Sequence, residues 1–168
     1  KKSVGLNGVG IKAVNALSSQ FTIKAFREGI VKSVYFSGGN IEKETGDEKT
    51  AEKNGTLVQF VPDGELFGNY RFIEDYVESL VRNYTYLNAG LVINLNGKKY
   101  VSKNGLLDLL EENMSSDGLY PIMHLKNGDL EVAMTHGNQY GETYYTFVNG
   151  QNTTQGGTHL QAFREAYV

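Results

Sequence analysis

Near its N-terminus the chain reads Gly5-Leu6-Asn7-Gly8-Val9-Gly10, followed by Ile11-Lys12-Ala13-Val14-Asn15-Ala16-Leu17. Ile11, Val14 and Leu17 recur at helical spacing, so this pattern predicts a glycine-rich loop that opens a helix. Glycines let a backbone approach a polyphosphate closely, and the free N–H groups of a helix N-terminus attract an anion. On the residues alone, the loop is either a phosphate-binding loop or a plain tight turn. It is not a Walker A loop, because no Gly-Lys-Ser/Thr follows it.

The composition is that of a folded domain with little net charge. The chain has 168 residues, of which 40% are hydrophobic, so it can bury a core. Sixteen basic and 19 acidic residues give a net charge of −3, which argues against a free-standing basic nucleic-acid clamp. The absence of cysteine excludes disulfides, thiolate zinc sites and cysteine nucleophiles.

The sequence also bears on where the protein works. No apolar run approaches the roughly 18 to 20 residues that span a bilayer, so we expect a cytoplasmic protein with no membrane contact. The chain starts without methionine and enters a glycine-rich loop at once, which suggests a piece of a larger protein.

The next segment predicts a small antiparallel sheet. Residues 21–27 and 30–36 alternate apolar and polar side chains around Glu28-Gly29, as in a hairpin. Residues 42–54 are polar and predict a solvated loop, and residues 55–61 predict a strand that ends at Pro62. Two polar residues here are candidates for a site, Arg27 and Thr56, although on the residues alone a cation at a hairpin end and a β-branched strand residue are the favoured explanations.

The middle of the chain predicts a helix, a hairpin and a second helix. Apolar residues repeat every three to four positions between Asn69 and Leu87, with Asn69 as the expected cap. Asn96-Gly97 is the preferred dipeptide of a tight hairpin turn, here between residues 91–95 and 98–102. Asn104 is then expected to cap a short leucine-rich helix.

The last third predicts a change of architecture. We place a domain boundary near residue 118, after Ser115-Ser116-Asp117, giving domains of residues 1–117 and 118–168. Strands are expected at residues 122–125, 130–135 and 142–148, and a final helix after Gly156-Gly157-Thr158.

Four segments together resemble one family. They are, in chain order, Ser3 to Ser18, Arg27-Glu28-Gly29, Asn54 to Asp63, and Phe147-Val148-Asn149 with Gly156 to Arg164. In this order they resemble the B subunit of bacterial type IIA DNA topoisomerases, and the chain is more similar to the topoisomerase IV B subunit than to gyrase B. The resemblance covers essentially the whole chain.

The resemblance implies an α/β (α+β) fold. Residues 1–117 would be the C-terminal part of a Bergerat-type ATPase α/β sandwich, from the ATP lid onward. Residues 118–168 would begin a transducer domain with a ribosomal-protein-like fold.

The resemblance also implies a nucleotide site. Leu6, Asn7, Gly8, Val9 and Gly10 match the end of the ATP lid, whose backbone amides hold the triphosphate. Thr56 matches a threonine that orients the adenine-binding aspartate, Val58 matches an apolar wall of the adenine pocket, and Arg27 matches an arginine at the pocket mouth. Because Thr56 and Val58 are two apart on a strand, they should share a face, with the Thr56 hydroxyl pointing inward.

Some family elements are expected outside this chain. The general-base glutamate, the magnesium-binding asparagine and the adenine-binding aspartate lie upstream of the lid in this family, and the lysine that senses the γ-phosphate lies downstream. We therefore expect no catalytic residue and no metal ligand here, and we expect the fragment alone to be inactive. The parent would use ATP and Mg²⁺, act on DNA with the topoisomerase A subunit, and form a B-subunit homodimer on ATP binding. The alternative is a non-catalytic nucleotide-sensing or protein-interaction module with the same fold.

Overall fold

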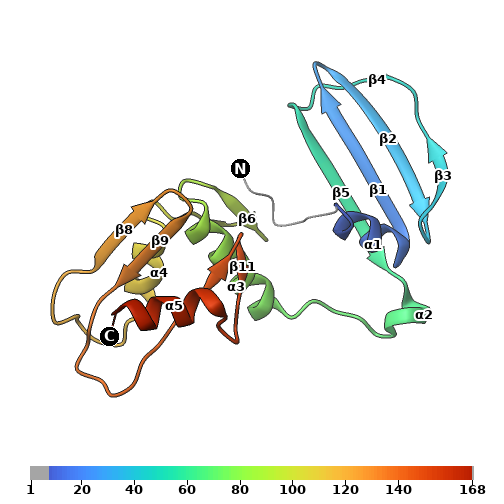
Figure 1. Cartoon of the computed structure of the whole chain (residues 1–168). Helices are drawn as coiled ribbons and strands as arrows, with labels where there is room; N and C mark the ends of the chain where they lie inside the picture. The colour runs from blue at the N-terminus through green and yellow to red at the C-terminus, as the bar shows by residue number, and fades with distance from the viewer. Residues whose placement is uncertain (1–7, 168) are drawn as a thin grey trace. The chain divides into compact units, whose positions relative to one another are not determined.

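The computed structural model of the chain describes residues 8–167 (Figure 1). These residues form two compact units, which divide between Arg71 and Phe72.

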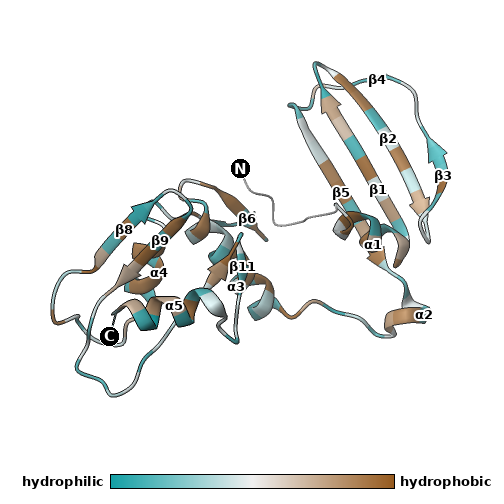
Figure 2. Ribbon diagram, viewed as in Figure 1, coloured by the Kyte–Doolittle hydropathy of each residue, from teal (hydrophilic) through white to brown (hydrophobic). Residues whose placement is uncertain are grey.

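The first unit is built on one antiparallel sheet. Its elements are α1 (Gly10–Ala16), β1 (Ser18–Arg27), β2 (Ile30–Ser37), β3 (Asn40–Glu44), β4 (Glu48–Lys49), β5 (Gly55–Pro62) and α2 (Gly64–Phe67). The strand order is β3-β2-β1-β5, and β4 also pairs with β2. Hydrophobic and hydrophilic residues alternate along β1 and β2, as expected of strands with two different faces (Figure 2).

The sheet buries Ser18 and Phe21 near α1, and Val31 and Ser33 in β2 nearer the β1-β2 turn. Phe21 is 1% exposed and its ring meets that of Phe36 edge to face, with centroids 5.9 Å apart. The helix α1 contacts β1, β2 and β5, and Ser18 donates a hydrogen bond of 2.6 Å to the carbonyl of Val14. The predicted helix and hairpin are therefore present, and the helix packs against β1, β2 and β5.

The prediction of a solvated loop over residues 42–54 is partly wrong. Residues 40–44 form β3 and residues 48–49 form β4, both at the edge of β2. The polar composition misled the prediction because an edge strand exposes its side chains, and every residue of β3 is exposed. Thr45 fixes this edge, since its hydroxyl accepts a hydrogen bond of 3.1 Å from the Ser33 amide.

The second unit combines helices with three small hairpins. Its elements are α3 (Glu74–Leu87), β6 (Ile93–Leu95), β7 (Lys98–Tyr100), α4 (Leu106–Asn113), β8 (Met123–Asn127), β9 (Leu130–Met134), β10 (Phe147–Val148), β11 (Gln151–Asn152) and α5 (Thr158–Tyr167). The strands pair as β6-β7, β8-β9 and β10-β11. The helix α3 packs against α4, β6 and β7, and α4 packs against β9. Tyr86, Tyr100 and Leu109 are the buried hydrophobic residues of this unit.

The helices α3 and α4 start at other residues than the sequence predicts. The helix α3 begins at Glu74 with Ile73 as its N-cap, so Asn69 is not the cap. Two acidic residues in the first turn, Glu74 and Asp75, favour this start because they complement the positive end of the helix dipole. The N-cap of α4 is Gly105 rather than Asn104.

The strand predicted over residues 142–148 is also too long. Only Phe147 and Val148 pair, with Asn152 and Gln151. Glu142 instead accepts a hydrogen bond of 2.9 Å from Arg164 in α5.

The predicted domain boundary near residue 118 lies inside the second compact unit. The helix α4 precedes this boundary and β9 follows it, yet the two are packed together (Figure 1). The division into domains 1–117 and 118–168 stays a prediction about family architecture.

Candidate functional site

The glycine loop leads directly into α1. Gly8 has a φ of +60°, a conformation that non-glycine residues rarely adopt. Val9 is the N-cap and makes no side-chain capping bond, and Gly10 is the first helical residue. A Cβ atom built at Gly8 or Gly10 would meet nothing within 4 Å, so the backbone there is open to an approaching group. Leu6 and Asn7 lie outside the described residues.

The remaining predicted site residues lie on one face of the sheet. In the β1-β5 pairing, Thr56 is opposite Ala25 and Val58 is opposite Ile23. Directly opposed residues of antiparallel strands project from the same face, as do residues two apart on one strand. Arg27 is two residues after Ala25 on β1. Arg27, Thr56 and Val58 therefore share a face, although they come from two strands.

This face is exposed within the described chain. Val58 is 43% exposed, Thr56 is also exposed, and the side chain of Arg27 is 84% exposed. The two residues on β5 do share a face, as the strand pattern predicts. The expected inward, covered position of the Thr56 hydroxyl is not found in this chain.

The turn beside Arg27 is held by a second segment. Glu28 and Gly29 both have positive φ, 52° and 78°. The amide of Glu28 donates a hydrogen bond of 2.8 Å to Asn54 Oδ1, and the amide of Thr50 donates one of 2.9 Å to the carbonyl of Gly29. The segment that precedes β5 thus fixes the hairpin end from which Arg27 projects.

Two cavities lie elsewhere, in the second unit. One, of about 290 Å³, is lined by residues of the α3 C-terminus, the start of α4 and the β8-β9 hairpin. The other, of about 550 Å³, lies between α3 and α4. Neither includes Arg27, Thr56 or Val58. Among residues 8–167 no group of three or more histidine or acidic residues could hold a metal ion, and no helix there is long and apolar enough to cross a membrane.

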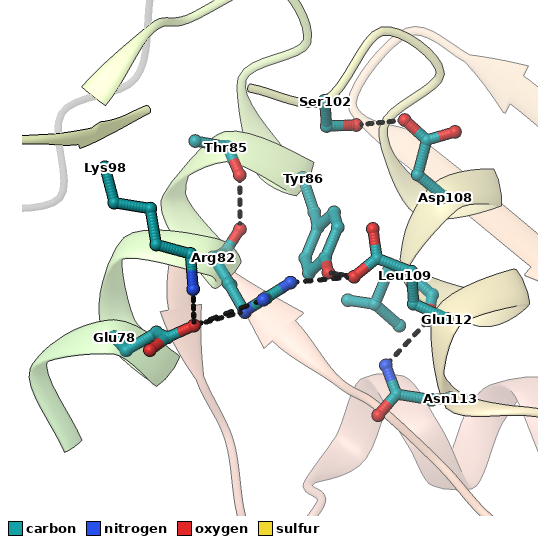
Figure 3. A network of polar contacts seen from close by, with 10 residues as sticks. All are labelled: Glu78, Arg82, Thr85, Tyr86, Lys98, Ser102, Asp108, Leu109, Glu112 and Asn113. Atoms are coloured by element: carbon teal, nitrogen blue, oxygen red, sulfur yellow. Dashed lines mark hydrogen bonds and ion pairs between the residues drawn. The ribbon is translucent and has the colours of Figure 1, made fainter. Parts of the chain in front are cut away.

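The groove between α3 and α4 contains a charged network (Figure 3). Arg82 donates through Nη1 to Glu112 at 2.9 Å and through Nη2 to Glu78 at 3.1 Å. Lys98 also donates to Glu78, at 3.2 Å. The cations of Arg82 and Lys98 lie 5.5 and 5.0 Å from the ring centroid of Tyr100. The network joins α3, α4 and β7 around a buried aromatic ring.

Contacts within the network shift the pKa of several of its groups, among them Glu78 and Tyr86. Hydrogen bonds from Lys98 and Arg82 lower the pKa of Glu78 below its usual value. Burial raises the pKa of Tyr86, and so does the hydrogen bond that its hydroxyl donates to Glu112. Glu78 is therefore ionised and Tyr86 neutral at neutral pH, which fits a structural role.

A second polar cluster precedes α4. The carboxylate of Asp108 accepts hydrogen bonds from the Ser102 hydroxyl at 2.7 Å, from the amides of Lys103 and Asn104 at 3.0 Å each, and from Asn104 Nδ2 at 2.8 Å. Burial alone would raise the pKa of Asp108, but the bonds from Ser102, Asn104 and Lys103 lower it overall. The ionised carboxylate of Asp108 therefore holds residues 102–104 in place in front of α4.

The three histidines make separate contacts. His124 lies 2.9 Å from Glu131, His136 lies between Tyr120 and Tyr167, and His159 lies 3.2 Å from the Thr153 hydroxyl. They do not form one site.

Comparison with known proteins assigns the chain to a family. The family model of DNA gyrase B matches residues 73–168, which is more than half of the chain. The chain belongs to the DNA gyrase B family. The recognition of a type IIA topoisomerase B subunit from the sequence motifs is thereby confirmed.

Relatives in this family match almost the whole chain. The B subunit of DNA topoisomerase 4 from Borreliella burgdorferi is 48% identical over 167 residues, which is 99% of this chain and 28% of that protein. The B subunit of DNA gyrase from Thermus thermophilus is 35% identical over 181 residues, again 99% of this chain and 28% of that protein. The chain thus spans somewhat more than a quarter of the length of these relatives.

A solved structure confirms the α/β fold. The crystal structure of the 43K ATPase domain of Thermus thermophilus gyrase B, in complex with an aminocoumarin, superposes with a TM-score of 0.76 and 34% identity. The match covers 96% of this chain and 48% of that chain. The part of this chain that the match covers therefore has an α/β fold similar to that of part of the gyrase B ATPase domain.

The sequence did not reveal the contacts that hold Arg82 and the Arg27 turn in place. Sequence reasoning did not find the pairing of Arg82 on α3 with Glu112 on α4, 30 residues along the chain. It also missed Asn54 as the brace of the Arg27 turn. No local pattern marks either contact, since each joins residues from separate elements.

Proposed function

We propose that this chain is part of the ATP-binding and ATP-hydrolysing clamp of a type IIA topoisomerase, which changes DNA topology by ATP-driven strand passage. The observation that carries the proposal is the common face of Arg27, Thr56 and Val58. In the family resemblance these three residues surround the adenine end of the nucleotide. Two neighbouring strands present them on one side of a sheet, as a pocket wall requires.

The glycine loop supports the phosphate end of the same site. Glycine at positions 8 and 10 leaves the backbone open, with no atom within 4 Å of a Cβ built there. A triphosphate needs this kind of close backbone approach. We assign ATP to this loop and to the sheet face, and we assign no Mg²⁺ ligand within the chain. Mg²⁺ would accompany ATP in the longer protein, where it neutralises phosphate charge.

The remaining parts of the proposal concern the longer protein. It would act in the cytoplasm on DNA, with the topoisomerase A subunit and as a B-subunit homodimer formed on ATP binding. The relatives are B subunits of topoisomerase 4 and of gyrase, which supports these partners. The alternative is a nucleotide-sensing or protein-interaction module of the same fold, without turnover.

Substitutions on the two faces of β5 distinguish loss of the proposed nucleotide site from general damage to the strand. In the longer protein, Thr56→Val and Val58→Lys change the proposed nucleotide face. The matched controls Leu57→Val and Gln59→Lys change the opposite face of the same strand, because side chains alternate. We expect the first pair to weaken ATP binding at least tenfold and the controls to leave it within about twofold, since removing one side of a polar contact costs about 1–3 kcal/mol.

The outcomes distinguish the two functions. Equal ATP affinity in all four variants would refute the nucleotide face. ATP binding without hydrolysis in the intact protein, with Mg²⁺ and DNA present, would favour the sensing module over the enzyme.

A further inference from the structure

The strand β9 packs against α4, and chain segments at both ends of that helix come close to Glu131 in β9 and to Thr135 just after it. At the start of α4, a Cβ built on Gly105 would lie 3.7 Å from Glu131 Oε1. After the end of α4, a Cβ built on Gly118 would lie 2.7 Å from Thr135 Oγ1. Glycine therefore occupies both of these positions.

The lengths of the two elements agree with this arrangement. Residues 131 and 135 are four positions apart in a segment that is a strand through Met134, a span of about 13 Å. The eight residues of α4 span about 12 Å. The distance from Glu131 to Thr135 therefore matches the length of α4, which packs against β9.

The segment after α4 is tied by hydrogen bonds to the residues that follow β9. The amide of Leu119 donates to the carbonyl of His136 at 2.7 Å, and the Thr135 hydroxyl donates to the carbonyl of Tyr120 at 3.0 Å. Ser115 adds a third bond, from its hydroxyl to Gln139 Oε1 at 2.8 Å. These three bonds join residues 115–120 to residues 135–139 and so restrain the linker between α4 and β8.

The starting loop of α4 is equally constrained. Gly105 has a φ of +66°, and a Cβ there would also lie 3.0 Å from the carbonyl of Tyr86. Glu131 is held in place by His124 and Lys126, each at 2.9 Å. Burial alone would raise the pKa of Glu131, but the bonds from these two residues lower it overall. The carboxylate over Gly105 is thus ionised and fixed on the hairpin.

We propose that residues 115–120 form a strap that locks the β8-β9 hairpin onto α4, with Gly118 as its closest point, so that helix and hairpin move as one body. The inference rests on the proposed function in one respect. If the parent is an ATP-driven clamp, a movement of α4 is passed to the hairpin through the strap, across the position at which the sequence predicts a domain boundary.

The test compares an alanine substitution at Gly118, inside the strap, with one at Gly137, in the segment that the strap contacts. Gly118→Ala places a methyl group against Thr135 Oγ1 and against the Tyr120 carbonyl, which would be 3.0 Å away. Gly137→Ala is the matched control, because its nearest atoms would be 3.9 Å away and its backbone needs no positive φ. A second pair is Thr135→Val, which removes the bond to Tyr120, and Thr135→Ser, which keeps a hydroxyl. This second pair is the test if Gly118→Ala does not fold.

The first readout is amide hydrogen exchange at Leu119 in this chain. We expect Gly118→Ala and Thr135→Val to speed exchange about fivefold or more, as the loss of one hydrogen bond implies, and the two controls to match the wild type. Exchange that is equal in all variants would overturn the strap.

The second readout uses the longer protein with its A subunit, DNA and ATP. We expect Gly118→Ala and Thr135→Val to keep wild-type ATP affinity while strand passage falls about fivefold or more. Faster Leu119 exchange with unchanged strand passage would overturn the transmission. If the longer wild-type protein did not bind ATP, the proposed function would fail, whereas the exchange result would still decide whether the strap exists.

Discussion

The guanidinium of Arg82 on α3 donates a hydrogen bond of 2.9 Å to the carboxylate of Glu112 on α4, 30 residues along the chain. The same guanidinium bonds to Glu78 and stacks over Tyr100. One side chain therefore connects three elements of the second unit. This arrangement makes Arg82 the first residue to test for stability.

Replacing Arg82 by alanine should destabilise the second unit by about 1–2 kcal/mol. The variant loses three charged hydrogen bonds, two to Glu78 and one to Glu112, and a cation–π contact. The Arg82 side chain is 41% exposed, so solvent screens part of the effect. Urea unfolding at pH 7 measures the change. Lys99→Ala, an exposed residue of β7, is the control and should shift stability by less than about 0.5 kcal/mol. Equal stability of the two variants would contradict the importance of this network.

Asp108 should make stability depend on pH in the acid range. Its pKa is lowered in the folded chain from an ordinary value of 3.8. A lowered folded pKa contributes stability that is present above the unfolded pKa and is lost as the pH falls through the folded pKa. Asp108→Asn should therefore be less stable than the wild type at pH 7, by about 1–2 kcal/mol, with the difference shrinking below about pH 3.8.

Urea unfolding at pH 7 and at pH 3 measures this dependence. Glu111→Gln in the same helix is the control, because Glu111 is exposed. A difference between Asp108→Asn and the wild type that stays constant with pH would show that the Asp108 charge does not stabilise the loop.

The two glycines of the loop before α1 should respond differently to substitution. Gly8→Val forces a β-branched residue into a φ of +60° and should disrupt the loop itself. Gly10→Ala needs no unusual backbone and meets open space, so the free protein should tolerate it. If ATP approaches this backbone in the longer protein, both variants should bind it more weakly, and ATP-dependent dimerisation should be lost in Gly8→Val. Wild-type ATP affinity in Gly8→Val would refute the phosphate role of the loop.

This chain alone should neither hydrolyse ATP nor relax DNA. Hydrolysis needs a positioned base and a metal, each worth orders of magnitude in rate, and we assign neither to these residues. Phosphate release with ATP and Mg²⁺ is the direct assay. A steady rate that disappears in Thr56→Val would show that catalytic groups have been assigned to the wrong part of the protein.

Local signals in the sequence were sufficient for several elements. The three-to-four-residue repeat predicted α3, Asn96-Gly97 predicted the turn between β6 and β7, and Glu28-Gly29 predicted the turn between β1 and β2. These features depend on side-chain period and on backbone conformations that few residues adopt, both of which are written in short stretches of sequence. The glycine loop and the later motifs also sufficed to recognise the family.

Other features exist only through contacts between distant segments. The common face of Arg27, Thr56 and Val58 follows from the register of β1 against β5, and a shift of one residue would reverse it. Edge strand β3 looked like a loop because its partner β2, rather than its own residues, makes it a strand. The pairing of Arg82 with Glu112, and of Gly118 with Thr135, requires α3, α4 and β9 to be packed first. Sequence period and turn chemistry determined which elements form, whereas register and packing decided which residues meet, because those depend on the free energy of contacts between segments that are far apart in the chain.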